Sequence, residues 1–106
     1  MTFFLVHTLV TPPEWDDSEL DALREKEKAV AHGLQEQGTL VALWREVGKL
    51  AAFSVWQSDN LEKLQENLAL LPFYQFMEFE VAEISPHPNS LHPFPVPHGD
   101  SMTRAG

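Results

Sequence analysis

The most constraining feature of the sequence is the order of its strand-like and helix-like segments. Four stretches of eight or nine residues are rich in Phe, Leu, Val and Trp, which is typical of strands. Two longer stretches repeat apolar residues at helical spacing. Strands are expected at 2–10, 39–47, 50–57 and 76–84, and helices at 16–37 and 59–71.

Capping residues and helix breakers predict where the two helices begin and end. Asp16 and Ser18 are each followed three residues later by an acidic residue, so either can start the first helix. Gly38 is a suitable stop for that helix. Asp59 has the same capping pattern for the second helix, and Pro72 is expected to stop it.

The order βαββαβ predicts an α+β fold of the ferredoxin-like, split-βαβ type, with both helices on one face of an antiparallel sheet. Only Gly48–Lys49 separates the second strand from the third, which favours a hairpin. The first and third strands are apolar on both faces, so the face away from the helices must also be covered. A second copy of the sheet is the simplest cover, giving a homo-oligomer of the dimeric α/β-barrel type.

Length and composition favour one domain with a tail. The ferredoxin-like domain is expected to span residues 1–85, and a Pro-rich arm spans 86–106, where five of the eight prolines lie. The first ten residues lack the basic flank and the cleavage site of a signal peptide. No apolar run approaches the ~20 residues of a membrane helix, so the cytoplasm is the expected compartment.

Charge and residue types exclude several classes of function. Seven basic residues stand against 16 acidic ones, a formal charge of -9, which argues against nucleic acid and anionic membranes as partners. No cysteine is present, so a thiol nucleophile and a Cys-based metal site are excluded. The spacing of His87, His92 and His98 matches no zinc pattern, and no metal or other cofactor is expected.

Glu27 is the most informative polar residue. Counting along the first helix places it in the middle of the apolar stripe, facing the sheet. Burial there raises the pKa of a carboxyl, which suits an acid-base group. Alternatively, a slight rotation of the helix leaves Glu27 at the edge of the stripe, paired with Arg24 or Lys28. The stripe consists of Leu20, Leu23, Val30, Ala31 and Leu34.

Arg45 and His7 also interrupt apolar strands. Arg45 has the planar fork that binds a substrate carboxylate, or it forms a structural ion pair with Glu46 or another acidic residue. His7 is either a base or, more commonly for a lone strand histidine, a hydrogen-bonded packing residue.

Six motifs, in register and almost without gaps from about Phe3 to Leu91, resemble the muconolactone Δ-isomerase family. They are Leu23-Arg24-Glu25-Lys26-Glu27-Lys28, Leu34-Gln35-Glu36-Gln37-Gly38, Leu43-Trp44-Arg45, Phe53-Ser54-Val55, Leu71-Pro72-Phe73 and His87-Pro88-Asn89-Ser90-Leu91. The resemblance implies a ferredoxin-like fold, tight dimers and a ring-like decamer.

The resemblance also implies a cofactor-free proton shift that converts muconolactone to 3-oxoadipate enol-lactone, in the β-ketoadipate route of aromatic catabolism. The family's acid-base glutamate falls on Glu27. The arm at His87-Pro88 would reach a neighbouring subunit. The expected substrate-binding residues are Arg45, Lys49, Phe53, Ser54 and His7.

One segment departs from the family pattern. Typical members carry Tyr-Ala-Asn-Tyr where this chain has Leu50-Ala51-Ala52-Phe53, and a histidine where Ala42 stands. The lost polar groups are of the kind that orient a charged lactone. Two alternatives therefore stay open: an enzyme of the same fold acting on a different or chlorinated lactone, and a non-catalytic oligomeric module that binds a small ligand.

Overall fold

The computed structural model describes residues 2–91, so the part of the expected arm beyond Leu91 lies outside the described residues. The order of elements confirms the βαββαβ prediction. The elements are β1 (Thr2–Val10), α1 (Asp17–Glu36), β2 (Leu40–Arg45), β3 (Ala51–Ser58), α2 (Leu61–Leu68), a 3-10 turn η1 (Tyr74–Phe76) and β4 (Met77–Ile84).

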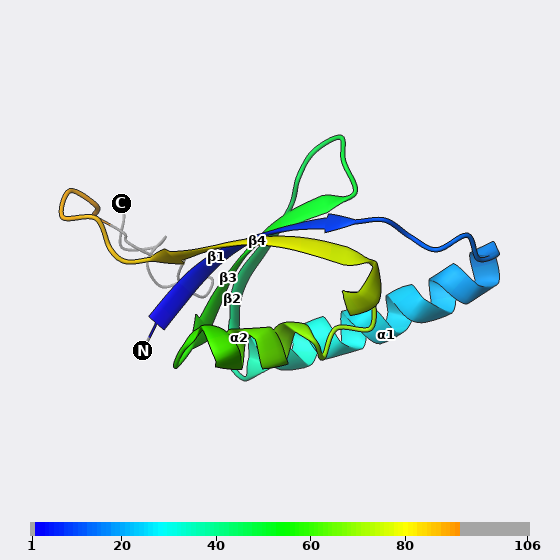
Figure 1. The fold of residues 1–106 in the computed structure, drawn as a ribbon, viewed down its shortest axis with the longest axis horizontal. Helices are drawn as coiled ribbons and strands as arrows, with labels where there is room; N and C mark the ends of the chain where they lie inside the picture. The colour runs from blue at the N-terminus through cyan, green and yellow to red at the C-terminus, as the bar shows by residue number, and fades with distance from the viewer. Residues whose placement is uncertain (1, 92–106) are drawn as a thin grey trace, which may run out of the picture.

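The strands form one antiparallel sheet in the order β2-β3-β1-β4. Both helices cover the same face of this sheet, and the β2–β3 hairpin rises on the other face (Figure 1). This is the ferredoxin-like arrangement. The central strands are β3 and β1, which are also the two strands that the sequence marks as apolar on both faces.

The ends of α1 agree with the sequence. The Asp16 carboxylate accepts a 2.8 Å hydrogen bond from the peptide N–H of Glu19, so Asp16 rather than Ser18 caps the helix. Gly38 follows the C-cap with φ +82°, a conformation that glycine adopts without strain.

The ends of α2 and of the hairpin correct the prediction. The N-cap is Asn60, not Asp59, because the Asn60 side chain accepts from the peptide N–H of Lys63 at 2.8 Å. The helix ends at Leu68, well before Pro72, since the chain then tightens into i→i+3 hydrogen bonds. The hairpin turn is longer than two residues, with Gly48 at φ +85°.

The core lies between the sheet and the helices. Leu64 and Leu68 of α2 are buried there, but Leu61, expected in the same stripe, is 47% exposed. Leu61 is the first residue of the helix. The core residues are Phe4, Val6, Leu34, Leu40, Trp56, Leu64, Leu68 and Leu71.

Within residues 2–91 no helix and no second sheet covers the face away from the helices, and only the β2–β3 hairpin rises on it (Figure 1). Trp44, Phe53 and Leu9 remain partly exposed on it, with Trp44 at 46%.

At the end of β4 the chain leads away from the sheet, and Ser90 N–H donates to the His87 carbonyl at 2.9 Å in a turn.

Candidate active site

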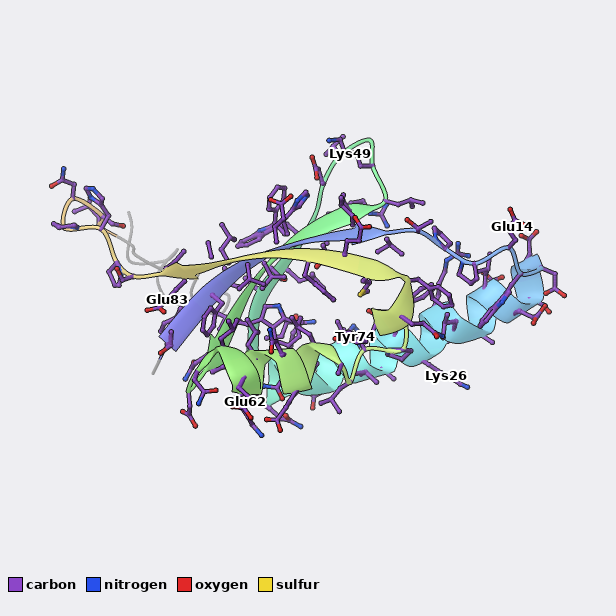
Figure 2. The ribbon with its side chains drawn as sticks, viewed as in Figure 1. Glu14, Lys26, Lys49, Glu62, Tyr74 and Glu83 are labelled. Atoms are coloured by element: carbon purple, nitrogen blue, oxygen red, sulfur yellow. The ribbon has the colours of Figure 1, made fainter. Side chains whose placement is uncertain are left out.

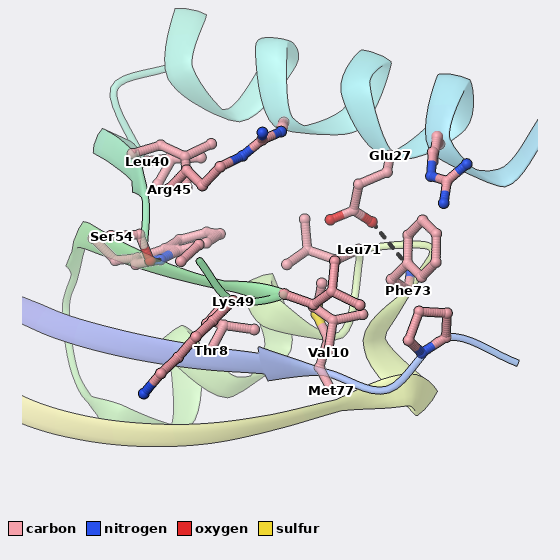
Figure 3. Close-up of a pocket in the computed structure, with 18 of the residues that line it drawn as sticks. Thr8, Val10, Glu27, Leu40, Arg45, Lys49, Ser54, Leu71, Phe73 and Met77 are labelled. Atoms are coloured by element: carbon pink, nitrogen blue, oxygen red, sulfur yellow. Dashed lines mark hydrogen bonds between the residues drawn. The ribbon is translucent and has the colours of Figure 1, made fainter. Parts of the chain in front are cut away.

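A cavity of about 760 Å³ opens between α1, the helix-facing side of the sheet and the turn that precedes β4 (Figure 3). A volume of this order suits a small-molecule ligand. Its walls are mostly apolar, with a few polar groups. The residues that line it are Thr8, Val10, Pro12, Arg24, Glu27, Ala31, Leu40, Leu43, Arg45, Gly48, Lys49, Leu50, Ala51, Ala52, Ser54, Trp56, Leu71, Phe73 and Met77.

Glu27 projects from the middle of α1 into this cavity. Its Oε1 atom accepts a 3.0 Å hydrogen bond from the peptide N–H of Phe73. Figure 3 shows the other carboxyl oxygen turned toward the middle of the cavity. The alternative pairing with Arg24 does not form, because Arg24 donates to Asp21 at 3.0 Å.

Burial raises the pKa of Glu27 above its ordinary value of 4.5, and the hydrogen bond from Phe73 opposes that rise. Burial acts by removing water that would stabilise the charged form, whereas the peptide N–H stabilises the carboxylate. A carboxyl with these two opposing influences, at the wall of an apolar cavity, is chemically suited to take up and release a proton.

Arg45 lines the same cavity from the end of β2. A register shift between Leu40 and Ala42 allows both Leu40 and Arg45 to face the helices, although an odd number of positions separates them. The structural pair with Glu46 does not form, since Glu46 binds other residues. None of the ion pairs within residues 2–91 includes Arg45.

Lys49 and Ser54 also line the cavity, but their polar atoms are engaged elsewhere. The Lys49 ammonium lies 3.4 Å from Oε2 of Glu46 and points away from Glu27 (Figure 3). Figure 2 places Lys49 on the hairpin that rises from the other face of the sheet. The buried Ser54 hydroxyl accepts from Trp56 Nε1 at 2.8 Å and donates to the Val6 carbonyl at 3.4 Å.

His7 and Phe53 do not line the cavity, which corrects the expectation that they contact the substrate there. Strand alternation turns both away from the helices, because their neighbours Val6 and Ser54 face inward. The two rings stack with centroids 4.4 Å apart. His7 Nε2 lies 2.7 Å from Oε1 of Glu46, an interaction that lowers the pKa of Glu46. These contacts agree with the second interpretation, in which His7 is a hydrogen-bonded packing residue.

Three groups in the cavity were not predicted from the sequence. Thr8 shares the inward face of β1 with Phe4 and Val6, so the period-two spacing of the strand could have predicted its inward position. Arg24 lies one helical turn before Glu27. The peptide N–H of Phe73 has no signature in the sequence, because every residue except proline carries one.

The cavity has a different charge balance from the rest of the chain. Of the seven basic residues, three line it (Arg24, Arg45 and Lys49), whereas of the 16 acidic residues only Glu27 does. Within residues 2–91 no group of three or more His, Asp or Glu side chains is arranged to hold a metal ion. No helix in this described part has the length and apolarity to cross a membrane.

The fold and the cavity define a class, that of small ferredoxin-like α+β proteins with a ligand-sized hollow between sheet and helices. The family within that class follows from comparison. The family model described as muconolactone delta-isomerase matches residues 1–90. The chain belongs to the muconolactone delta-isomerase family, and is an intramolecular isomerase.

Individual relatives agree with this assignment. The muconolactone delta-isomerase of Pseudomonas aeruginosa is 32% identical over 92 residues, which cover 87% of this chain and 96% of the relative. That of Pseudomonas putida is 34% identical with the same coverage. A crystal structure of muconolactone isomerase superposes with a TM-score of 0.74 at 35% identity, over 87% of this chain and 96% of that one.

Proposed function

We propose that this chain converts muconolactone to 3-oxoadipate enol-lactone in aromatic catabolism, with Glu27 as the acid-base group and no cofactor. The observation that carries the proposal is the Glu27 carboxyl, half-buried at the wall of the cavity with one oxygen directed into it. The names of the similar proteins support muconolactone as the substrate.

The reaction is a 1,3-proton shift that needs no oxidant or reductant. The Glu27 carboxylate removes the ring proton next to the lactone oxygen, and the electron pair of that C–H bond spreads into a dienolate. The carboxylic acid then returns a proton at the other end of the allylic system, which regenerates the carboxylate. A pKa raised by burial favours both halves of this exchange, since the proton must be taken up and given back.

Arg45 is the proposed partner of the substrate carboxylate. Its guanidinium lines the cavity without an ion-pair partner in the described residues, whereas Lys49 is paired with Glu46. A guanidinium binds a carboxylate through two parallel hydrogen bonds. Of the cations that line the cavity, Arg24 and Lys49 are paired with carboxylates outside it, so Arg45 is the one within residues 2–91 that is available to an anionic ligand.

A different or chlorinated lactone is the second candidate substrate. Leu50 and Ala52 form apolar wall where typical family members are expected to carry a phenol and an amide. An apolar wall loses hydrogen bonds to a polar ring but tolerates an added chlorine or methyl group.

A second copy of this chain is the proposed cover of the sheet face opposite the helices. Trp44, Phe53 and Leu9 together leave an apolar surface there that a symmetric partner would bury. As part of the same proposal, the dimers assemble into a larger ring and the enzyme acts in the cytoplasm, where a catabolic intermediate is available.

The proposal is tested by incubating the purified protein with muconolactone and with methyl- and chloro-substituted lactones, and following product by ultraviolet absorbance and proton NMR. Turnover of muconolactone at the highest kcat/KM supports the first substrate. Preference for a substituted lactone supports the second. Binding of the lactones in thermal-shift measurements without any turnover would show the chain to be a ligand-binding module instead.

A further inference from the structure

The hydrogen bond to Glu27 comes from the main chain, in a turn that other contacts hold in place. Tyr74 N–H donates to the Leu71 carbonyl at 2.9 Å, and Phe76 N–H donates to the Phe73 carbonyl at 2.8 Å. The Phe76 carbonyl in turn accepts from Thr11 N–H at 2.8 Å, which connects the turn to the chain after β1. The peptide group that carries the Phe73 N–H therefore lies between two peptide groups that are held by hydrogen bonds.

Side chains attach the same turn to the start of α1. Leu71 and Phe73 are buried. The Phe76 ring makes edge contacts with Phe73 at 6.4 Å and with Trp15 at 5.8 Å between centroids. Trp15 immediately precedes the Asp16 cap of α1. The helix that carries Glu27 and the turn that carries the donor are thus held together at a second point.

We propose that the peptide N–H of Phe73 is a positioning group that anchors Oε1 of Glu27 and leaves Oε2 as the oxygen that transfers the proton. This inference rests on the proposed role of Glu27. With one oxygen anchored, the carboxyl no longer turns freely, and the second oxygen stays directed into the cavity. The same bond favours the carboxylate over the acid, so it keeps Glu27 available as a base.

The direct test replaces the Phe73 peptide bond by an ester, through incorporation of the α-hydroxy analogue of phenylalanine at this position. The side chain is kept and only the N–H is lost. We expect kcat for muconolactone to fall on the order of 10-fold, as for other hydrogen bonds to charged groups. We also expect the acid limb of the pH–rate profile to move to higher pH, with KM changed less than kcat.

Two controls separate this effect from a general loss of structure. The same incorporation system supplying phenylalanine at 73 must restore the parent profile. An ester at Leu70, whose N–H donates to the Asn67 carbonyl at 3.1 Å in a nearby exposed turn, removes a comparable bond without touching Glu27. It should leave the acid limb in place. An unchanged acid limb in a folded Phe73 ester would overturn the proposal.

A second measurement needs no variant of the turn. In the parent protein the amide proton of Phe73 should shift with pH and report the same midpoint as the acid limb of activity. An amide that does not titrate contradicts the proposal. Failure of the proposed function is distinguishable, because it appears as absence of turnover in the parent protein or as activity that survives Glu27→Gln.

Discussion

Phe73 and Glu27 are 46 positions apart in the sequence, yet the peptide N–H of Phe73 donates a 3.0 Å hydrogen bond to the Glu27 carboxyl. The bond joins the middle of α1 to the turn before β4 at the wall of the cavity. It accounts for the inward orientation of a charged group that would otherwise turn toward water.

The stability of the protein should depend on pH through Glu27. Burial raises the pKa of this carboxyl in the folded state above 4.5, its ordinary value in an unfolded chain. The stabilising contribution is therefore complete below 4.5 and is lost as pH rises through the folded-state pKa. Glu27→Gln removes this dependence, so the Tm of the parent minus that of the variant should decrease from acidic to neutral pH. A difference that increases over this range contradicts the burial argument.

Arg45→Gln should raise KM for an anionic lactone about 10- to 100-fold, with a smaller effect on kcat, because the lost bond is made to a charged group of the substrate. Lys63→Gln is the control, since Lys63 pairs only with Glu66 at 3.8 Å on the surface of α2. Steady-state kinetics give KM and kcat for both variants. An unchanged KM in the Arg45 variant would show that the substrate carboxylate binds elsewhere in the cavity.

Ser54→Ala should weaken the fold more than it weakens substrate binding. The Ser54 hydroxyl accepts from the buried Trp56 indole, and its removal leaves that N–H unpaired at a cost of about 1–3 kcal/mol. Urea unfolding measures the loss of stability, and kinetics on the folded variant should give a KM within about twofold of the parent. A large rise in KM at unchanged stability would instead show that the Ser54 hydroxyl binds the substrate.

Self-association through the open sheet face is tested by two variants, each of which replaces a large apolar residue by glutamate. The two replaced side chains are exposed to nearly the same extent. Trp44→Glu introduces a charge on that face, where Trp44 is 46% exposed, and should dissociate the oligomer. Leu61→Glu introduces the same charge on α2, where Leu61 is 47% exposed, and should leave the oligomer intact. Light scattering after size exclusion gives both masses. Equal masses for the parent and the Trp44 variant would contradict the proposed interface.

The fold and the inward position of Glu27 could be predicted from the sequence because both depend on periodic features. Glu27 was found by counting helical positions, and the order of elements followed from alternating apolar segments. The same period-two rule, applied from Val6 to His7, would have placed His7 and its neighbour Phe53 on the opposite face. The inward direction of Arg45 was not predictable by alternation, since it depends on the irregular pairing between Leu40 and Ala42.

The hydrogen bond from the turn before β4 to Glu27 could not be predicted from side-chain patterns. The donor at Phe73 is a backbone group, and the turn that carries it is held by contacts of the Phe76 ring with Phe73 and with Trp15. Similarly, Lys49 was expected to bind the substrate carboxylate, and its pairing with Glu46 instead could not be predicted because it depends on the shape of the hairpin.

The central claim, that the inward carboxyl of Glu27 moves the proton, is tested most directly by the kcat of Glu27→Gln on muconolactone. Glutamine keeps the size of the side chain and can still accept a hydrogen bond from Phe73, but it cannot take up a proton. Glu25→Gln, an exposed substitution on the same helix, is the matched control. The account predicts that Glu27→Gln lowers kcat at least about 100-fold while Glu25→Gln stays near the parent. A folded Glu27→Gln variant with the kcat of the parent would contradict it.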